Sequence, residues 1–196
     1  RFGLCGKVIS EHGQVKTITN ISSINVRIPH EISGISNNLL NKIIIKDEIK
    51  NTLIFSPPFL GKTTLIKDLA KNINNNYFYQ ILVIDERGEF ENVNGKNIDK
   101  ISFSKKDYAF NYTIRSMSPE IIICDEIYSE NDWNFLNEIT KTGIKVIVTC
   151  HAEKIEDILR KQFFNKEIFD IYIQIKKEKE KGIIGKIYNK NFELIC

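Results

Sequence analysis

Residues 56–64 combine the side-chain types that bind phosphate. They read Ser-Pro-Pro-Phe-Leu-Gly-Lys-Thr-Thr and lie between an apolar stretch and a segment with helical periodicity. The first turn of a helix offers unpaired N–H groups and a partial positive charge to an anion. Gly61 lets the backbone approach the phosphates, Lys62 reaches the β- and γ-phosphates, and the Thr63 hydroxyl binds Mg²⁺ in such loops. The segment therefore predicts a site for ATP and Mg²⁺.

The predicted nucleotide-binding residues are Ser56, Pro57, Pro58, Phe59, Leu60, Gly61, Lys62, Thr63 and Thr64. Two of them depart from the usual phosphate-loop pattern. Ser56 stands where the first glycine is expected, and Phe59 is bulky where a small residue is commoner. The ring of Phe59 has to point away from the phosphates, or it would fill their space. The alternative interpretation is an ordinary strand–loop–helix that contains Gly-Lys-Thr by chance.

Two adjacent carboxylates, Asp125 and Glu126, follow the apolar stretch Ile121–Cys124. An ATPase needs one carboxylate to organise the Mg²⁺ shell and another to activate water. We therefore predict that Asp125 holds the metal through its water shell. Glu126 is predicted to orient the attacking water or to accept its proton. The alternative is that the acidic pair only begins a solvated loop.

A second acidic cluster, Asp85–Phe90, ends the preceding apolar stretch and contains Arg87. Ligands of open α/β sheets bind beyond the carboxyl ends of the strands, so both acidic clusters should meet in one crevice. His151 ends a third apolar stretch, where it would sense the γ-phosphate or relay a proton. Arg87 and Arg115 are candidates for stabilising negative charge, across a subunit boundary if subunits assemble. A structural histidine and surface ion pairs are the competing interpretations.

The spacing of apolar residues predicts the elements that position these side chains. The expected strands are Thr52–Ser56, Ile81–Ile84, Ile121–Cys124 and Val146–Val148, and the expected helices are Thr63–Ile73, Asp132–Thr140 and Glu153–Phe164. Continuous apolar runs indicate strands that are buried on both faces. Their alternation with helices predicts an α/β fold with a mostly parallel sheet flanked by helices. The run Asn74–Asn76 reads as a loop.

The two ends of the chain are predicted to be rich in β-structure. Extended candidates near the start are Leu4–Ile9, Val15–Ile18 and Ser23–Ile28, followed by a possible short helix at Ile35–Ile45. Near the other end, Phe169–Ile175 and Ile183–Tyr188 flank a charged segment and predict a terminal hairpin. The first residue is Arg1 and the only methionine is Met117, so we expect a fragment of a longer protein.

The composition excludes several classes of protein. Twenty-eight basic and 25 acidic side chains are mixed along the 196 residues, which gives no clustered basic face and makes nucleic acid an unlikely partner. The four cysteines lie far apart with no CxxC pair, so we predict reduced thiols and no zinc. No apolar run approaches the roughly 20 residues that span a bilayer, and no signal peptide is visible. These features indicate a cytosolic globular protein.

A larger set of residues forms a recognisable combination: Arg115–Glu120 leading into Asp125-Glu126, Thr149–His151, Ser22–Asn25, the Ser-Pro-Pro start of the phosphate loop, and Asp85–Arg87. Over nearly the whole chain, this combination resembles stage III sporulation protein AA of endospore-forming bacteria. The family usually has glycine where this chain has Phe59, and alanine where it has Cys150. The family also has an N-terminal region that this chain lacks.

That family is similar in turn to secretion and pilus-motor ATPases with a RecA-like core. The resemblance implies a RecA-like P-loop ATPase domain at residues 46–196, and makes residues 1–45 a remnant of a truncated N-terminal domain and linker. The acidic box of these secretion and pilus-motor ATPases matches Asp85, Glu86 and Glu89, which adds Glu86 and Glu89 to the catalytic candidates. Their second acidic motif matches Asp125-Glu126, and their histidine box matches His151.

The resemblance also implies a biological setting. It implies a homo-hexameric ring in the mother-cell cytoplasm, peripheral at the membrane that faces the forespore. Its partners would be membrane proteins of the sporulation channel, and ATP hydrolysis would drive assembly or transport there.

Two other function classes stay open from the sequence. A nucleic-acid-handling ATPase is one, although Lys176–Lys181 alternates in charge instead of forming a basic patch. A ring scaffold that uses nucleotide only for order is the other, and the departures at Ser56 and Phe59 keep it open. A salt-dependent shift with single-stranded nucleic acid would support the first class. Phosphate release with Mg²⁺ separates the scaffold from an enzyme.

Overall fold

The computed structural model of the chain describes residues 2–26, 32–102, 116–179 and 181–195. The chain forms two compact units, residues 1–31 and 32–196. In the first unit, β1 (Phe2–Glu11) pairs antiparallel with β2 (Gln14–Val26). The described part of the predicted strand Ser23–Ile28 is therefore the end of β2 and not a separate strand. Residues 32–45, predicted to belong to the N-terminal segment, lie in the second unit.

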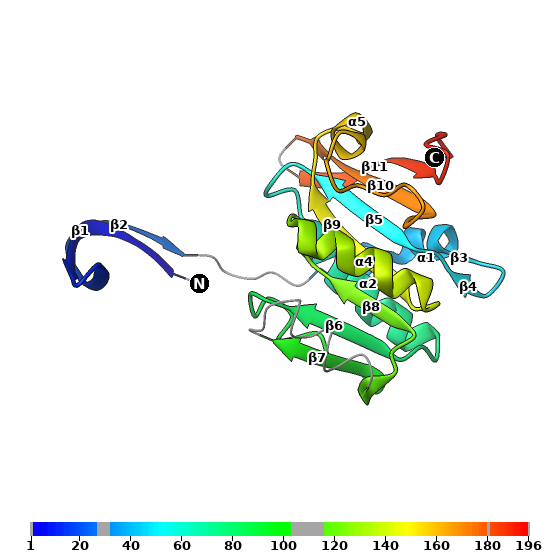
Figure 1. The fold of residues 1–196 in the computed structure, drawn as a ribbon, viewed down its shortest axis with the longest axis horizontal. Helices are drawn as coiled ribbons and strands as arrows, with labels where there is room; N and C mark the ends of the chain where they lie inside the picture. The colour runs from blue at the N-terminus through cyan, green and yellow to red at the C-terminus, as the bar shows by residue number, and fades with distance from the viewer. Residues whose placement is uncertain (1, 27–31, 103–115, 180, 196) are drawn as a thin grey trace. The chain divides into compact units, whose positions relative to one another are not determined.

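The second unit is built around a sheet whose seven strands, among the described residues, run in the order β11-β10-β5-β9-β8-β6-β7 (Figure 1). Neighbouring strands are parallel except for the antiparallel pair β10 and β11. The strands are β5 Thr52–Ser56, β6 Ile81–Asp85, β7 Ile98–Ser102, β8 Ile121–Cys124, β9 Lys145–His151, β10 Ile171–Glu178 and β11 Lys181–Asn189. The predicted α/β fold with a mostly parallel sheet is confirmed.

Helices cover both faces of this sheet (Figure 1). They are α1 Asn37–Ile43, α2 Lys62–Asn76, α4 Glu130–Lys141 and α5 Ile155–Leu159, and a small extra pair is formed by β3 Ile44–Ile45 and β4 Glu48–Ile49. No helix in the described part of the chain is both long enough and apolar enough to cross a membrane.

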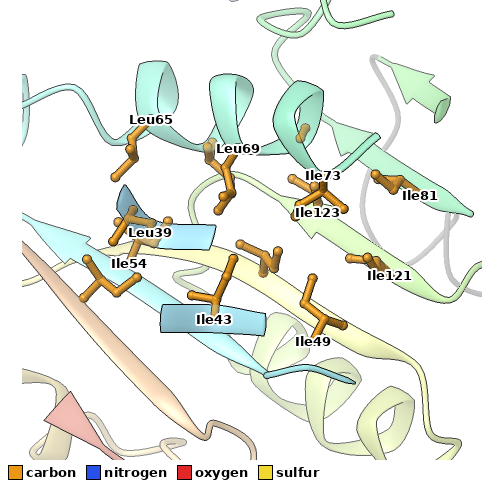
Figure 2. Close-up of a cluster of buried hydrophobic side chains, with 14 of the residues drawn as sticks. Leu39, Ile43, Ile49, Ile54, Leu65, Leu69, Ile73, Ile81, Ile121 and Ile123 are labelled. Carbon is orange, nitrogen blue, oxygen red and sulfur yellow. The ribbon is translucent and has the colours of Figure 1, made fainter. Parts of the chain in front are cut away.

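Alternate residues of the central strands enter two separate cores. In β8, Ile121 and Ile123 belong to the core under α1 and α2, whereas Ile122 belongs to the core under α4 and α5. Figure 2 shows Leu65 and Leu69 of α2 lying over the first of these cores. Burying one aliphatic side chain stabilises the folded state by roughly 1.5–3 kcal/mol. Strands with apolar residues at every position gain this stabilisation on both faces of the sheet. The phosphate loop between β5 and α2 is thereby attached to two rigid elements.

Two local predictions differ from the structure, and one strand was missed. The run Asn74–Asn76 is not a loop but the last turn of α2, where the Asn76 side chain donates a hydrogen bond to the Asn72 carbonyl oxygen at 2.8 Å. The helix predicted at Glu153–Phe164 is shorter, because α5 begins at Ile155 and ends at Leu159. Strand β7 was not predicted at all, because it has only two apolar residues, Ile98 and Ile101, separated by two charged ones, and lies half-exposed at the end of the sheet.

Helix α2 also fixes the start of α1 through a buried carboxylate. Asp68 is only 6% exposed and accepts hydrogen bonds from the backbone N–H of Gly34 at 2.9 Å and of Ser36 at 2.8 Å. The Ser36 hydroxyl donates a third bond to Asp68, at 2.7 Å. These donors precede the first turn of α1, where backbone N–H groups lack helical partners. Asp68 therefore links α1 to the helix that begins at the phosphate loop.

Replacing Asp68 with alanine should lower the free energy of unfolding by about 2 kcal/mol, because the buried donors of Ser36 lose their acceptor. Chemical denaturation followed by circular dichroism measures this difference. The matched control is Asp99→Ala in β7, an exposed aspartate whose loss should change stability by less than about 0.5 kcal/mol. Equal stability of the two variants would contradict the role given to Asp68.

Candidate active site

The carboxyl ends of four neighbouring parallel strands meet at one edge of the sheet (Figure 1). Ser56 at the end of β5 lies opposite His151 at the end of β9. Cys124 at the end of β8 lies opposite Val148 of β9 and Ile84 of β6. The segments that follow these strands therefore leave the sheet close together, as the sequence predicts.

The phosphate loop passes from β5 to α2 through two left-handed residues. Gly61, the residue before α2, has a φ of 85°, and Phe59 has a φ of 64°. A positive φ is unfavourable for a residue with a Cβ atom but not for glycine. The left-handed conformation at position 61 therefore explains why a glycine stands there. The Phe59 side chain is 88% exposed, so its ring is not part of the core. Thr64 is half-buried in the first turn of α2.

The Lys62 ammonium group is buried against the loop that precedes it. Its side chain is 6% exposed, and Nζ donates at 3.1 Å to the carbonyl oxygens of Ser56 and Pro57 and to the Ser56 hydroxyl. Nζ also lies 3.0 Å from Nδ1 of His151. Burial lowers the pKa of Lys62, and the nearby negative charge of Asp125 partly opposes this shift. The lysine is thus held at the site in an environment that favours an added anion.

Asp125 joins the phosphate-loop helix to the neighbouring strands. Its Oδ2 accepts a hydrogen bond from the Thr63 hydroxyl at 2.6 Å, and its Oδ1 accepts one from the Thr149 hydroxyl. The two residues predicted to form the Mg²⁺ site, Thr63 and Asp125, are therefore in direct contact. This contact is made between α2 and the end of β8, two elements far apart in the sequence.

Glu126 directly follows and is held by three neighbours. Its φ is 55°, and its backbone N–H donates to the Thr149 hydroxyl at 2.8 Å. Its carboxylate forms an ion pair with Arg87 and lies 3.4 Å from Nε2 of His151. Although burial lowers the pKa of Arg87, the hydrogen bond and charge of Glu126 outweigh this effect, so the net shift is upward. The Thr149 hydroxyl thus contacts the side chain of Asp125 and the backbone of Glu126 at the end of β8.

His151 connects the lysine to the glutamate. Nζ of Lys62 lies 3.0 Å from Nδ1 of His151, and a charged lysine in this contact can only donate. The other ring nitrogen, Nε2, faces the Glu126 carboxylate. The chain Lys62–His151–Glu126–Arg87 therefore crosses the site from the phosphate loop to the second acidic cluster.

The second acidic cluster is shaped by Asp85. This buried carboxylate accepts hydrogen bonds from the backbone N–H of Glu89 at 2.9 Å and of Phe90 at 2.8 Å, so it stabilises the loop that follows β6. A small pocket is lined by Ile84, Asp85, Glu86, Arg87, Glu89 and Asp125. Residues of both acidic clusters therefore line one pocket.

Thr149 and Cys150 could not be given roles from the sequence. Thr149 lies two residues before His151, at the end of an apolar strand, and that position was the available signal. Cys150 is fully buried, and burial raises its pKa to about 12, so its thiol is not a nucleophile near neutral pH. Arg115 lies outside the described residues.

The side chains present fit a magnesium ion that is shared with a nucleotide. Mg²⁺ keeps several waters and binds one or two carboxylates together with substrate phosphates. Thr63 and Asp125 supply a hydroxyl and a carboxylate in contact with each other. In the described part of the chain, no three His, Cys, Asp or Glu side chains gather to hold a metal ion by themselves.

Comparison with known proteins gives a family match over nearly the whole chain. The family model described as sporulation stage III, protein AA, matches residues 1–195. The stage III sporulation protein AA of Bacillus subtilis (strain 168) is 35% identical over 207 residues, and the match covers 97% of this chain and 67% of that protein.

Solved structures share the fold at low sequence identity. The ATPase DotB of Yersinia pseudotuberculosis matches with a TM-score of 0.64 and 15% identity, over 82% of this chain and 49% of that chain. The pilus retraction motor PilT, with bound ADP, matches with a TM-score of 0.59 and 14% identity, over 84% of this chain and 54% of that chain. The chain thus spans about half of each solved chain, and the likeness shows a shared P-loop ATPase fold.

Proposed function

The chain belongs to the sporulation stage III protein AA family, and we propose that it binds ATP with Mg²⁺ and hydrolyses ATP as a motor-type ATPase. The hydrogen bond between Thr63 and Asp125 carries this proposal, because it joins the phosphate loop to the acidic strand end that a P-loop ATPase requires. Lys62 lies at the same edge of the sheet.

The phosphate-binding roles fall on the start of α2. The backbone N–H groups from Gly61 onward, together with the Lys62 ammonium, bind the β- and γ-phosphates. Lys62 exchanges its contacts with Ser56 and Pro57 for phosphate oxygens, which suits a desolvated cation. Thr63 and Asp125 hold the metal site. When bound there, Mg²⁺ supplies positive charge that offsets the charge of the phosphate oxygens.

Glu126 is the proposed residue that orients and deprotonates water. Its carboxylate is paired with Arg87 and His151, so one oxygen must turn toward the water before a proton can move. His151 links this carboxylate to the phosphate-binding lysine. A change in the position of Lys62 when the γ-phosphate binds or leaves would therefore be transmitted through His151 to Glu126. Once Arg87 has separated from Glu126, its guanidinium stabilises negative charge on the reacting phosphate oxygens. Glu86 and Glu89 line the same pocket and are the other candidates for the base.

The biological role proposed is work on the channel between mother cell and forespore. The family match supports a sporulation role, and the fold shared with DotB and PilT supports a motor-type activity. We propose a homo-hexameric ring in the mother-cell cytoplasm that acts with membrane proteins of that channel at the membrane facing the forespore. A neighbouring subunit would then supply further charge to each site.

Two measurements test this proposal. Calorimetry should show ATP binding that depends on Mg²⁺, and phosphate release per subunit should rise with protein concentration if subunits complete each other's sites. Binding without phosphate release at any concentration would favour the ring scaffold. No heat with ATP and Mg²⁺ from the folded protein would remove the nucleotide-binding proposal itself.

A further inference from the structure

The C-terminal hairpin extends beyond the strand that leads to the phosphate loop. β10 pairs with β5 only from Ile171 to Gln174, opposite Thr52 to Phe55. β5 ends one residue later at Ser56, whereas β10 continues to Glu178 and pairs there with β11. The last part of the β10–β11 hairpin therefore lies beside the chain that follows β5, which is the phosphate loop.

The hairpin and the loop meet backbone to backbone at Gly182. A Cβ atom added to Gly182 would overlap the carbonyl oxygen of Leu60 and would lie 2.9 Å from the Leu60 carbonyl carbon. Neither atom belongs to a flexible side chain that could turn away. It would also lie 3.0 Å from a methyl carbon of Ile175 on β10. This position on β11 therefore accepts only glycine without a shift of the hairpin or of the loop.

Side-chain packing supports the same contact. Leu60 is partly buried and packs against the core under α1 and α2, which includes Ile175 of β10. Ile184 of β11 is likewise partly buried and packs against that core. Phe59, the residue before Leu60, is 88% exposed. The part of the loop next to Gly61 is thus held by the core and the hairpin.

From these observations we infer that the β10–β11 hairpin is a positioning element for the phosphate loop, and that Gly182 sets the distance between them. This inference rests on the proposed nucleotide site and deepens it. The peptide bond from Leu60 to Gly61 carries one of the N–H groups that face an anion at the start of α2. A displaced Leu60 carbonyl would rotate that N–H group away from the phosphates.

The test compares Gly182→Ala with Gly185→Ala, two substitutions in the same strand. A Cβ atom on Gly185 would come no closer than 3.2 Å to its neighbours, the Gln174 carbonyl oxygen and a Lys176 side-chain carbon. Gly182→Ala should speed hydrogen exchange of the amides of Phe59, Leu60 and Gly61 in the nucleotide-free protein. It should also weaken ATP binding about tenfold, as expected for overpacking against a rigid neighbour. Gly185→Ala should do neither.

Each outcome has a distinct meaning. If the wild-type protein binds ATP and Gly182→Ala changes neither exchange nor affinity, the inference is wrong and the proposed function stands. If the wild-type protein does not bind ATP, the proposed function fails, and the exchange comparison alone decides the inference. Should Gly182→Ala fail to fold, Ile184→Ala replaces it, and unchanged exchange of the three amides in that variant overturns the inference.

Discussion

Replacing Lys62 with alanine should lower ATP turnover by at least about a thousandfold, to the background of the assay. The lysine is the cation at the start of α2, and its Nζ is enclosed by the loop and by His151. A cation in such a desolvated position interacts strongly with phosphate charge, and alanine leaves nothing to replace it. Steady-state phosphate release with Mg²⁺ measures the effect.

The fold should survive this substitution. Burial already disfavours the charged form of Lys62, so removing that charge does not remove a strongly stabilising interaction. The matched control is Lys67→Ala, which deletes the same charge from the same helix, where Nζ lies over the ring of Phe90, 5.6 Å from its centroid. Turnover should be nearly unchanged in this control. Full activity of a folded Lys62→Ala protein would disprove the assignment of the phosphate site.

The second large effect is expected for Glu126→Gln. Glutamine keeps the shape of the side chain but cannot accept a proton from water, so turnover should fall by about 10²–10⁴-fold. ATP affinity should stay within about threefold, because Glu126 is not among the residues proposed to contact the phosphates or the metal. Single-turnover phosphate release separates the chemical step from binding, and calorimetry gives the affinity.

Glu86→Gln and Glu89→Gln are the matched controls for that experiment, because both residues line the same pocket as Asp125. Each should retain most of the turnover, since Glu126 is the acid that is connected through His151 to Lys62. If Glu86→Gln or Glu89→Gln retains nucleotide and loses turnover while Glu126→Gln stays active, the base lies in the second acidic cluster. The roles of Arg87 and His151 would then need to be reassigned.

Sequence patterns located the central elements because those elements are buried on both faces. Thr52–Ser56 and Ile121–Cys124 were predicted with the bounds that the structure gives, since uninterrupted apolar runs have few alternatives to a buried parallel strand. Strand β7 is half-exposed at the end of the sheet, and its sequence, Ile98–Ser102, lacks such a run. The helical end of α2 at Asn74–Asn76 was missed because its asparagines are stabilised by side-chain contacts, including one from the Asn97 backbone.

The candidate site divides in the same way. Gly61, Lys62 and Thr63 could be proposed from the sequence because local order, strand then loop then helix, is what creates an anion site in such proteins. The role of Thr149 could not be found, because it depends on the pairing of β8 with β9. Asp68 and Gly182 also gave no local signal, since their partners, Ser36 and Leu60, lie 32 and roughly 120 positions away.

The amino-acid sequence by itself determined the kind of fold. Its apolar runs specify the strands, and its phosphate loop and strand-end acids are the basis of the proposed chemistry. Only the tertiary structure decided how the polar groups are paired: Lys62 with His151, Glu126 with Arg87, and Asp125 with Thr63. The physical reason is the separation along the chain of the residues that interact. Burial and helix formation depend on near neighbours in the chain, whereas a hydrogen bond across strands exists only after the register of the sheet has brought its donor and acceptor together.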